Sequence, residues 1–168
     1  MKFVHIQPHH AEALQRFLLD FDDHGESDIP AYFAPRDWSH ERIIDTFMAW
    51  SKGERLAENW TPCFTFFAEE EGELCGVYNI RNLGLEDLER WNTHVGYSVR
   101  PSYRGRGLAT AMLKDACGFA QSFGMKCLEL TCDAENIASR RVIEKNGGVL
   151  VDTYPEDERI TQRFSLAI

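Results

Sequence analysis

The chain has 168 residues, a length that suits a single domain over 1–168, and 43 % of them are apolar, which is enough for a hydrophobic core. Its formal net charge of −9 argues against nucleic acid or an anionic membrane surface as a partner. No stretch reaches the roughly 18 consecutive apolar residues of a membrane span, and the first residues lack a secretory signal, so we expect a cytoplasmic protein without membrane contact.

Seven apolar or alternating segments predict strands, and four segments with apolar residues at helical spacing predict helices. The strands are expected at 3–6, 62–69, 74–81, 94–99, 126–132, 149–154 and 160–168. The helices are expected at 8–21, 40–50, 107–123 and 137–145, and a charged, irregular stretch at 82–92. Ser39 is a candidate N-cap for the second helix, and Gly124 a left-handed stop for the third. This order of elements is typical of an α/β domain around a mixed sheet.

The cysteine pattern bears on redox and metal chemistry. The five cysteines are odd in number and form no Cys-x-x-Cys pair. Most lie in apolar runs, as in 127–132, which favours buried free thiols in a reducing compartment. The adjacent His9 and His10 have no histidine partner at helical i,i+4 spacing. We therefore expect neither a disulfide framework nor a metal site.

The stretch from Val99 to Thr110 carries the clearest chemical signal. It reads Val-Arg-Pro-Ser-Tyr-Arg-Gly-Arg-Gly-Leu-Ala-Thr and joins the end of an expected strand to the start of an expected helix. The first amides of a helix lack intrahelical partners, and glycines let a backbone approach an anion closely, so the turn predicts a diphosphate site. The alternative is a turn that only connects two elements. The dinucleotide fingerprint fits poorly, because Thr110 stands at its third glycine, and the Walker A pattern is absent.

Two blocks of sequence resemble one known family. Residues 104–109, Arg-Gly-Arg-Gly-Leu-Ala, resemble the Gln/Arg-x-x-Gly-x-Gly/Ala signature of the GNAT superfamily of N-acetyltransferases. Residues 136–147 resemble the second conserved block of that family, one helix and one strand later, and 95–102 is similar to a bacterial subgroup of predicted acetyltransferases. The resemblance implies a single-domain GNAT-like α/β fold, with a mixed central sheet of about six to seven strands flanked by about four helices.

The resemblance also implies a donor site. Acetyl-CoA is expected in a cleft where two central strands splay apart, within a core at 94–150, and no metal is implied. The amides of the glycine turn are expected to hold the pyrophosphate, the Val99 N–H to polarise the thioester carbonyl, and Asn136 and Ser139 to line the pantetheine channel. The expected cofactor-binding residues are Val99, Arg104, Gly105, Arg106, Gly107, Leu108, Ala109, Thr110, Asn136 and Ser139.

Acetyl transfer to an amine needs a base. A free alkyl amine has a pKa near 10, so only about one molecule in a thousand is unprotonated at pH 7. We rank His94 first, because it begins the strand that reaches the thioester and because histidine titrates near neutrality. The other candidates are Tyr97, Asp133 and Glu69. Each of the four also has a structural alternative. His94 is then a packing or surface histidine and Tyr97 an aromatic packed on the sheet. Asp133 then starts a turn, and Glu69 belongs to a solvated run of glutamates.

The position of the family's usual general acid holds no proton donor in this chain. Many family members place a tyrosine four residues after the position of Ser139, and Ile143 stands there in this chain. An isoleucine cannot donate a proton to the leaving thiolate. Tyr154 or a water is a possible substitute, and a thiolate can also leave as the anion.

We expect an acyltransferase that moves an acetyl group from acetyl-CoA to a primary amine of a small molecule or peptide, as a monomer or homodimer. A catalytically weak or inactive acyl-CoA-binding or sensing module is the first alternative, and a scaffold that binds no CoA is the second. The acceptor is expected to meet the helix-rich part at 1–60, the stretch at 82–92 and the loop at 155–158. The aromatics of these regions either line a pocket for a cationic amine or complete the core: Tyr32, Phe33, Trp38, Trp50, Trp60 and Trp91.

Overall fold

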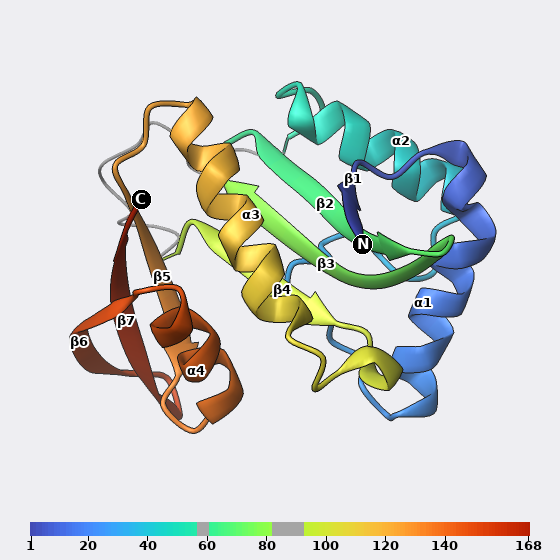
Figure 1. The fold of residues 1–168 in the computed structure, drawn as a ribbon. Helices are drawn as coiled ribbons and strands as arrows, with labels where there is room; N and C mark the ends of the chain where they lie inside the picture. The colour runs from blue at the N-terminus through green and yellow to red at the C-terminus, as the bar shows by residue number, and fades with distance from the viewer. Residues whose placement is uncertain (57–60, 82–92) are drawn as a thin grey trace.

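The computed structural model of the chain describes residues 1–56, 61–81 and 93–168 (Figure 1). Its helices are α1 (Ala11–Asp23), α2 (His40–Ser51), α3 (Leu108–Ser122) and α4 (Ile137–Lys145), with short 3-10 turns η1 (Pro8–His10) and η2 (Pro101–Tyr103). Its strands are β1 (Lys2–Val4), β2 (Cys63–Glu70), β3 (Glu73–Arg81), β4 (Val95–Val99), β5 (Cys127–Asp133), β6 (Val149–Glu156) and β7 (Arg159–Ala167). The expected order of elements is confirmed. The stretch expected to be irregular, 82–92, lies outside the described residues.

The strands form two sheets where the sequence predicts one mixed sheet. The first has the order β1-β2-β3-β4 and the second the order β5-β7-β6, and every pairing inside them is antiparallel. Strands β4 and β5 are neighbours in space but belong to different sheets. Alternating hydrophobicity indicates which face of a strand is buried, and it does not indicate which strand pairs with which.

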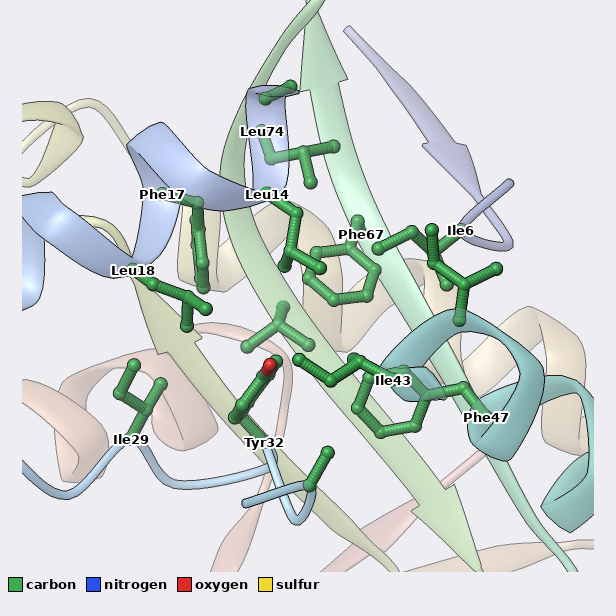
Figure 2. Close-up of a cluster of buried hydrophobic side chains, with 14 of the residues drawn as sticks. Ile6, Leu14, Phe17, Leu18, Ile29, Tyr32, Ile43, Phe47, Phe67 and Leu74 are labelled. Atoms are coloured by element: carbon green, nitrogen blue, oxygen red, sulfur yellow. The ribbon is translucent and has the colours of Figure 1, made fainter. Parts of the chain in front are cut away.

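One face of the first sheet is covered by α1 and α2. Apolar residues recur at helical spacing in both helices, and their buried stripes meet Phe67 and Val77 of the sheet in one hydrophobic cluster (Figure 2). Phe17 packs edge-on against Phe67, with their ring centroids 5.8 Å apart. Tyr32, from the chain between the two helices, is buried in the same cluster.

The other face of the first sheet is covered by α3, which crosses β3 and β4 in Figure 1. Met112 and Leu113 of α3 are fully buried in a second cluster that continues across Leu128 and Leu130 of β5 to Ile143 of α4. This apolar layer holds the two sheets together beneath the helices. It therefore fixes where β4 and β5 lie relative to the start of α3.

Local signals place the helix ends as expected. The Ser39 hydroxyl accepts the Arg42 N–H at 3.3 Å, which caps α2. Gly124 has φ +81° directly after α3. The β2–β3 hairpin is tighter than the expected turn at 70–73, because the strands extend to Glu70 and from Glu73. Among the described residues, no helix is long and apolar enough to span a bilayer.

A partly buried ion-pair cluster, in which Asp20 is the most buried member, ties α1 to the end of β4. The Nε of Arg100 lies 2.6 Å from Oδ2 of Asp20, and its Nη1 lies 2.9 Å from Oε2 of Glu73. The hydroxyl of Ser102 also donates to Asp20. These bonds join α1, β3 and η2 at one point. They hold in place the backbone that leads into the glycine-rich turn.

Candidate active site

The turn between β4 and α3 leaves the start of α3 open. Gly105 and Gly107 have φ +77° and +80°. Gly107 is the N-cap of α3 and, as a glycine, has no side chain with which to cap the helix. A Cβ built on either glycine meets no atom within 4 Å. The left-handed backbone, and not crowding, therefore explains the two glycines. Open space therefore lies at both Cβ positions, next along the chain to the first amides of α3, at 108–110, which lack helical carbonyl partners.

The two arginines of the turn that were expected to bind the cofactor have protein partners. Nη1 and Nη2 of Arg104 each lie 2.6 Å from an oxygen of Glu26, which is in the chain between α1 and α2. The Nε of Arg104 donates to the Val99 carbonyl at 3.1 Å. Arg106 is exposed, and its guanidinium lies 4.8 Å from the centroid of the Tyr103 ring. The turn thus presents cationic groups to solvent, one of them balanced by a carboxylate.

Strands β4 and β5 are joined at one end and open at the other. The His94 N–H donates to the Glu129 carbonyl at 2.7 Å, and the Glu129 N–H donates to Nδ1 of the His94 ring at 2.8 Å. Beyond this point β4 pairs with β3 and β5 pairs with β7, so the two strands separate in the direction of α3. The expected splay between two central strands is present, and His94 with Glu129 forms its closed end.

The bonds of β4 to β3 define which of its N–H groups lie on the edge that faces the splay. The Arg100 N–H donates to the Cys75 carbonyl of β3 at 2.9 Å, which fixes the residues of β4 that bond to β3. Because successive residues of a strand direct their N–H groups to opposite sides, Val99 and Tyr97 direct theirs away from β3 and toward β5. This is the orientation that the expected role of the Val99 N–H requires.

Tyr97 links β4 to α4 across the splay. Its hydroxyl lies 2.9 Å from the Ser139 hydroxyl and 3.3 Å from the Ser139 carbonyl. The Oδ1 of Asn136 accepts the Ser139 N–H at 3.0 Å and caps α4. Burial raises the pKa of Tyr97 to about 12, and the bond with Ser139 offsets only part of that rise. Tyr97 and Ser139 therefore meet in the space where the donor channel was expected, and Asn136 lies at its rim.

His94 is buried, and its ring has a structural partner. Accepting the Glu129 N–H uses the lone pair of Nδ1, which places the proton of the neutral ring on Nε2. A ring in this state has no lone pair left with which to take a proton from an amine. The hydrogen bond thus supports a positioning role at the closed end of the splay, and it does not support the expected role as base.

The remaining candidates from the sequence lie apart from the splay or serve a turn. Glu69 is in β2, two strands from β4, and Oε2 lies 3.5 Å from Nε2 of His10. Tyr154 is in β6, which β7 separates from β5. Asp133, at the end of β5, accepts the Glu135 N–H at 2.8 Å. Of these three, only Asp133 is on a strand that borders the splay.

Ile143 lies in the core. Its side chain is 1 % exposed and belongs to the cluster beneath α3 and α4. A Cβ added to Gly148 would lie 2.3 Å from Cγ2 of Ile143, so the next strand begins tightly against it. The position expected for a general acid thus holds a packing residue.

The aromatics expected on the acceptor side divide into two groups. Tyr32 and Trp50 are buried in the first core cluster, and Trp38 packs against that cluster with Arg42 stacked 3.7 Å from its ring centroid. Phe33 is exposed to 36 %. Trp60 and Trp91 lie outside the described residues. The core therefore accounts for three of the four described aromatics. The loop expected at 155–158 is shortened to the hairpin turn at 157–158, because β6 extends to Glu156 and β7 begins at Arg159.

Two residues that the sequence analysis did not select belong to this site. Glu26 pairs with the glycine turn from 78 residues away, and an exposed carboxylate in a loop gives no sequence signal for such a contact. Glu129 is a charged residue in the middle of the apolar strand 127–132, and that break in the pattern is a usable signal. Among the described residues, no group of His, Cys, Asp or Glu side chains could hold a metal ion.

Comparisons with known proteins bear on the fold and on the family. No curated protein is detectably similar in sequence. The RimJ protein of Mycobacterium smegmatis, solved in complex with CoA-disulfide, superposes with a TM-score of 0.73 at 22 % identity, over 98 % of this chain and 80 % of that one. YncA, a putative acetyltransferase from Salmonella typhimurium solved with acetyl-CoA, gives 0.68 at 16 % identity, over 99 % and 92 %. A putative ribosomal-protein-serine acetyltransferase from Vibrio cholerae gives 0.67 at 19 % identity, over 99 % and 92 %.

These structural likenesses confirm the expected fold. The sequence itself identifies the family, because residues 1–149 match the model of the acetyltransferase (GNAT) domain. That match spans both the glycine turn and the α4 block. The expected resemblance and the expected acyltransferase class are confirmed, and the chain belongs to the GNAT family of acetyltransferases.

Proposed function

We propose that the protein transfers the acetyl group of acetyl-CoA to a primary amine, by direct attack of the amine in a ternary complex. One observation carries the proposal. The open start of α3, with its two left-handed glycines, lies directly beside the end of β4 whose edge faces the splay. A diphosphate and an extended amide-bearing arm fit these two features in succession.

The donor side of the proposal is the core at 94–150. The amides of 105–110 are suited to a diphosphate, because they combine an open helix start with the positive end of its dipole. The Val99 N–H is suited to the thioester carbonyl as a fixed dipole. Asn136 and Ser139 of α4 are suited to the amides of the pantetheine arm, because both border the splay.

Tyr97 is the residue that we propose as proton donor to the departing thiolate. Its pKa of about 12 keeps the phenol protonated at neutral pH, so its hydroxyl has a proton to give and cannot accept one from an amine there. Its hydroxyl reaches the α4 side of the splay, where the tyrosine of other family members is replaced by Ile143. We assign His94 a positioning role at the closed end.

The acceptor is proposed to approach over the helix-rich part at 1–60. The similarity to a protein named a ribosomal-protein-serine acetyltransferase supports testing a peptide amine beside small amines. Phe33 is the exposed aromatic of this part that we propose to meet such an acceptor, beside the Arg81 guanidinium that lies 5.3 Å from its ring centroid.

The experiment that tests the function measures two quantities on the purified protein. CoA affinity is measured by calorimetry, and release of the CoA thiol is measured with acetyl-CoA and a panel of small and peptide amines. Micromolar affinity together with amine-dependent thiol release supports the proposal. Affinity without turnover supports the alternative, a binding or sensing module, and the absence of affinity supports a scaffold.

A further inference from the structure

Glu129 lies on the face of β5 that the helices leave uncovered. Its neighbours Leu128 and Leu130 are 0 % and 1 % exposed and belong to the core beneath α3 and α4. Because side chains alternate along a strand, Glu129 points to the opposite face. Its side chain is 37 % exposed, so its carboxylate is accessible from that face.

The backbone of Glu129 is fixed at the closed end of the splay. Its carbonyl accepts the His94 N–H and its own N–H donates to the His94 ring, so both of its polar groups bind one residue. Under the proposed function the diphosphate lies at the open end, by α3, and the arm runs along β4 toward His94. The reacting end of the donor therefore approaches Glu129.

The carboxylate of Glu129 is not held by a strong partner among the described residues. Arg163 of β7 is its nearest cation, with Nη1 4.0 Å from Oε2, and the same arginine lies 3.2 Å from Oδ2 of Asp152 on β6. A close, two-pronged ion pair would occupy the lone pairs of both carboxylate oxygens, so that they could not accept a proton. The 4.0 Å contact between Arg163 and Glu129 leaves lone pairs available.

We propose that Glu129 is the general base of acetyl transfer, and that His94 positions it. The inference rests on the proposed function. A Glu129 oxygen takes one proton from the acceptor ammonium, directly or through one water, and the neutral amine attacks the thioester carbon. The new C–N bond forms and the C–S bond breaks with its electron pair on sulfur, which takes a proton from the Tyr97 hydroxyl. The attached nitrogen then gives up its second proton, which restores the tyrosine, and the carboxyl later returns its own proton to solvent.

The test compares Glu129→Gln with the wild type and with Asp152→Asn. Glu129→Gln keeps the shape of the side chain and removes the base, so kcat is expected to fall by about a hundredfold to ten-thousandfold with CoA affinity and Tm close to wild type. Asp152→Asn removes the other carboxylate that contacts Arg163, which lies on β6, across β7 from Glu129. The kcat of this variant is expected to stay within about threefold of wild type. Glu129→Ala is expected to regain rate when formate is added.

The outcomes separate the two proposals. A wild type that binds CoA and turns over amines, together with a Glu129→Gln variant of nearly unchanged kcat, overturns the base and leaves the function standing. If Glu129→Gln loses CoA affinity or Tm in proportion to its loss of rate, and formate does not rescue Glu129→Ala, the role of Glu129 is structural. That result also overturns the assignment of Glu129 as the base. A wild type without turnover overturns the function and the base together.

Discussion

Arg104 and Glu26 are 78 residues apart in sequence and form a two-pronged ion pair, in which each Nη of the guanidinium lies 2.6 Å from a carboxylate oxygen. The pair joins the glycine turn of the donor site to the chain between α1 and α2. Its hydrogen bonds with Arg104 hold the pKa of Glu26 below the ordinary value for glutamate. The charge of Arg104, one of the two arginines that follow η2 in this turn, is therefore already neutralised when an anionic ligand arrives.

Glu26→Gln is expected to tighten CoA binding. The substitution frees the charge of Arg104 beside the proposed diphosphate site, and because both side chains are well exposed the gain is expected to be about 1 kcal/mol or less, up to about fivefold in Kd. Calorimetric titrations with CoA at low and high salt measure the change, which should shrink at high salt. Glu12→Gln, a change of equal charge on α1, is the control. Weaker binding by Glu26→Gln would instead show that the ion pair preorganises the site.

Gly107→Val is expected to weaken CoA binding far more than it weakens folding. A valine at φ +80° is strained, at a cost of about 1–3 kcal/mol, while its Cβ meets no protein atom. The same Cβ projects into the space proposed for the diphosphate. Gly118→Ala is the matched control, because Gly118 is inside α3 without positive φ and should gain about 0.5–1 kcal/mol of stability with unchanged affinity. CoA affinity and Tm are measured together, and unchanged affinity in folded Gly107→Val contradicts the site.

Local chemistry in the sequence predicts much of this fold. The Ser39 cap, the stop at Gly124 and the apolar face of α3 follow from short-range spacing, and each is confirmed. The division into two sheets could not be predicted, since β4 and β5 are both apolar strands and nothing local records that they belong to different sheets and meet through the bonds between His94 and Glu129. The long-range contact of Glu26 is hidden for the same reason.

The parts of the candidate site that depend on backbone conformation could be predicted from the sequence. The parts that depend on contacts between distant side chains could not. The glycine turn is a local requirement of φ, so the sequence carries it directly. The role of His94 depends on the amide of Glu129, 35 residues later, and a histidine that begins a strand gives no sign of that partner. Ile143 was recognised as a departure from the family, and the core that surrounds it explains why a polar group is absent there.

Asp20→Asn is expected to destabilise the fold at neutral pH and to matter less in acid. Burial by itself raises the pKa of Asp20, but hydrogen bonds from Ser102 and Arg100 outweigh it and leave the pKa below its ordinary value. A carboxyl with a lowered folded-state pKa contributes stability above its unfolded pKa of about 3.9, and that contribution is lost as pH falls through the folded value.

Urea denaturation measures the effect of Asp20→Asn on the free energy of unfolding. At pH 7 the variant is expected to lose about 2 kcal/mol, because Arg100 keeps its bond to Glu73 but loses its partner on α1. The gap to wild type should close as the pH drops below about 4. Asp23→Asn, an exposed aspartate at the end of the same helix, is the control, and an equal loss for both variants contradicts the role given to the buried pair.

Tyr97→Phe is expected to slow acetyl transfer most for weakly nucleophilic amines. Departure of sulfur limits the rate for such amines, and the variant lacks the hydroxyl that we propose as its proton donor. A loss of about tenfold to a hundredfold in single-turnover rate is expected for weak amines and a smaller loss for strong ones, with CoA affinity within about twofold. Because the pKa of Tyr97 is about 12, the wild-type rate should show no falling limb from this group between pH 7 and about pH 10.

Tyr154→Phe is the control for this prediction. It removes the same hydroxyl from a tyrosine in β6, two strands away from β5, and is expected to leave the rate unchanged. If Tyr154→Phe loses two orders of magnitude while Tyr97→Phe keeps its rate, the proton donor is Tyr154, and the bond between Tyr97 and Ser139 serves only to hold β4 against α4.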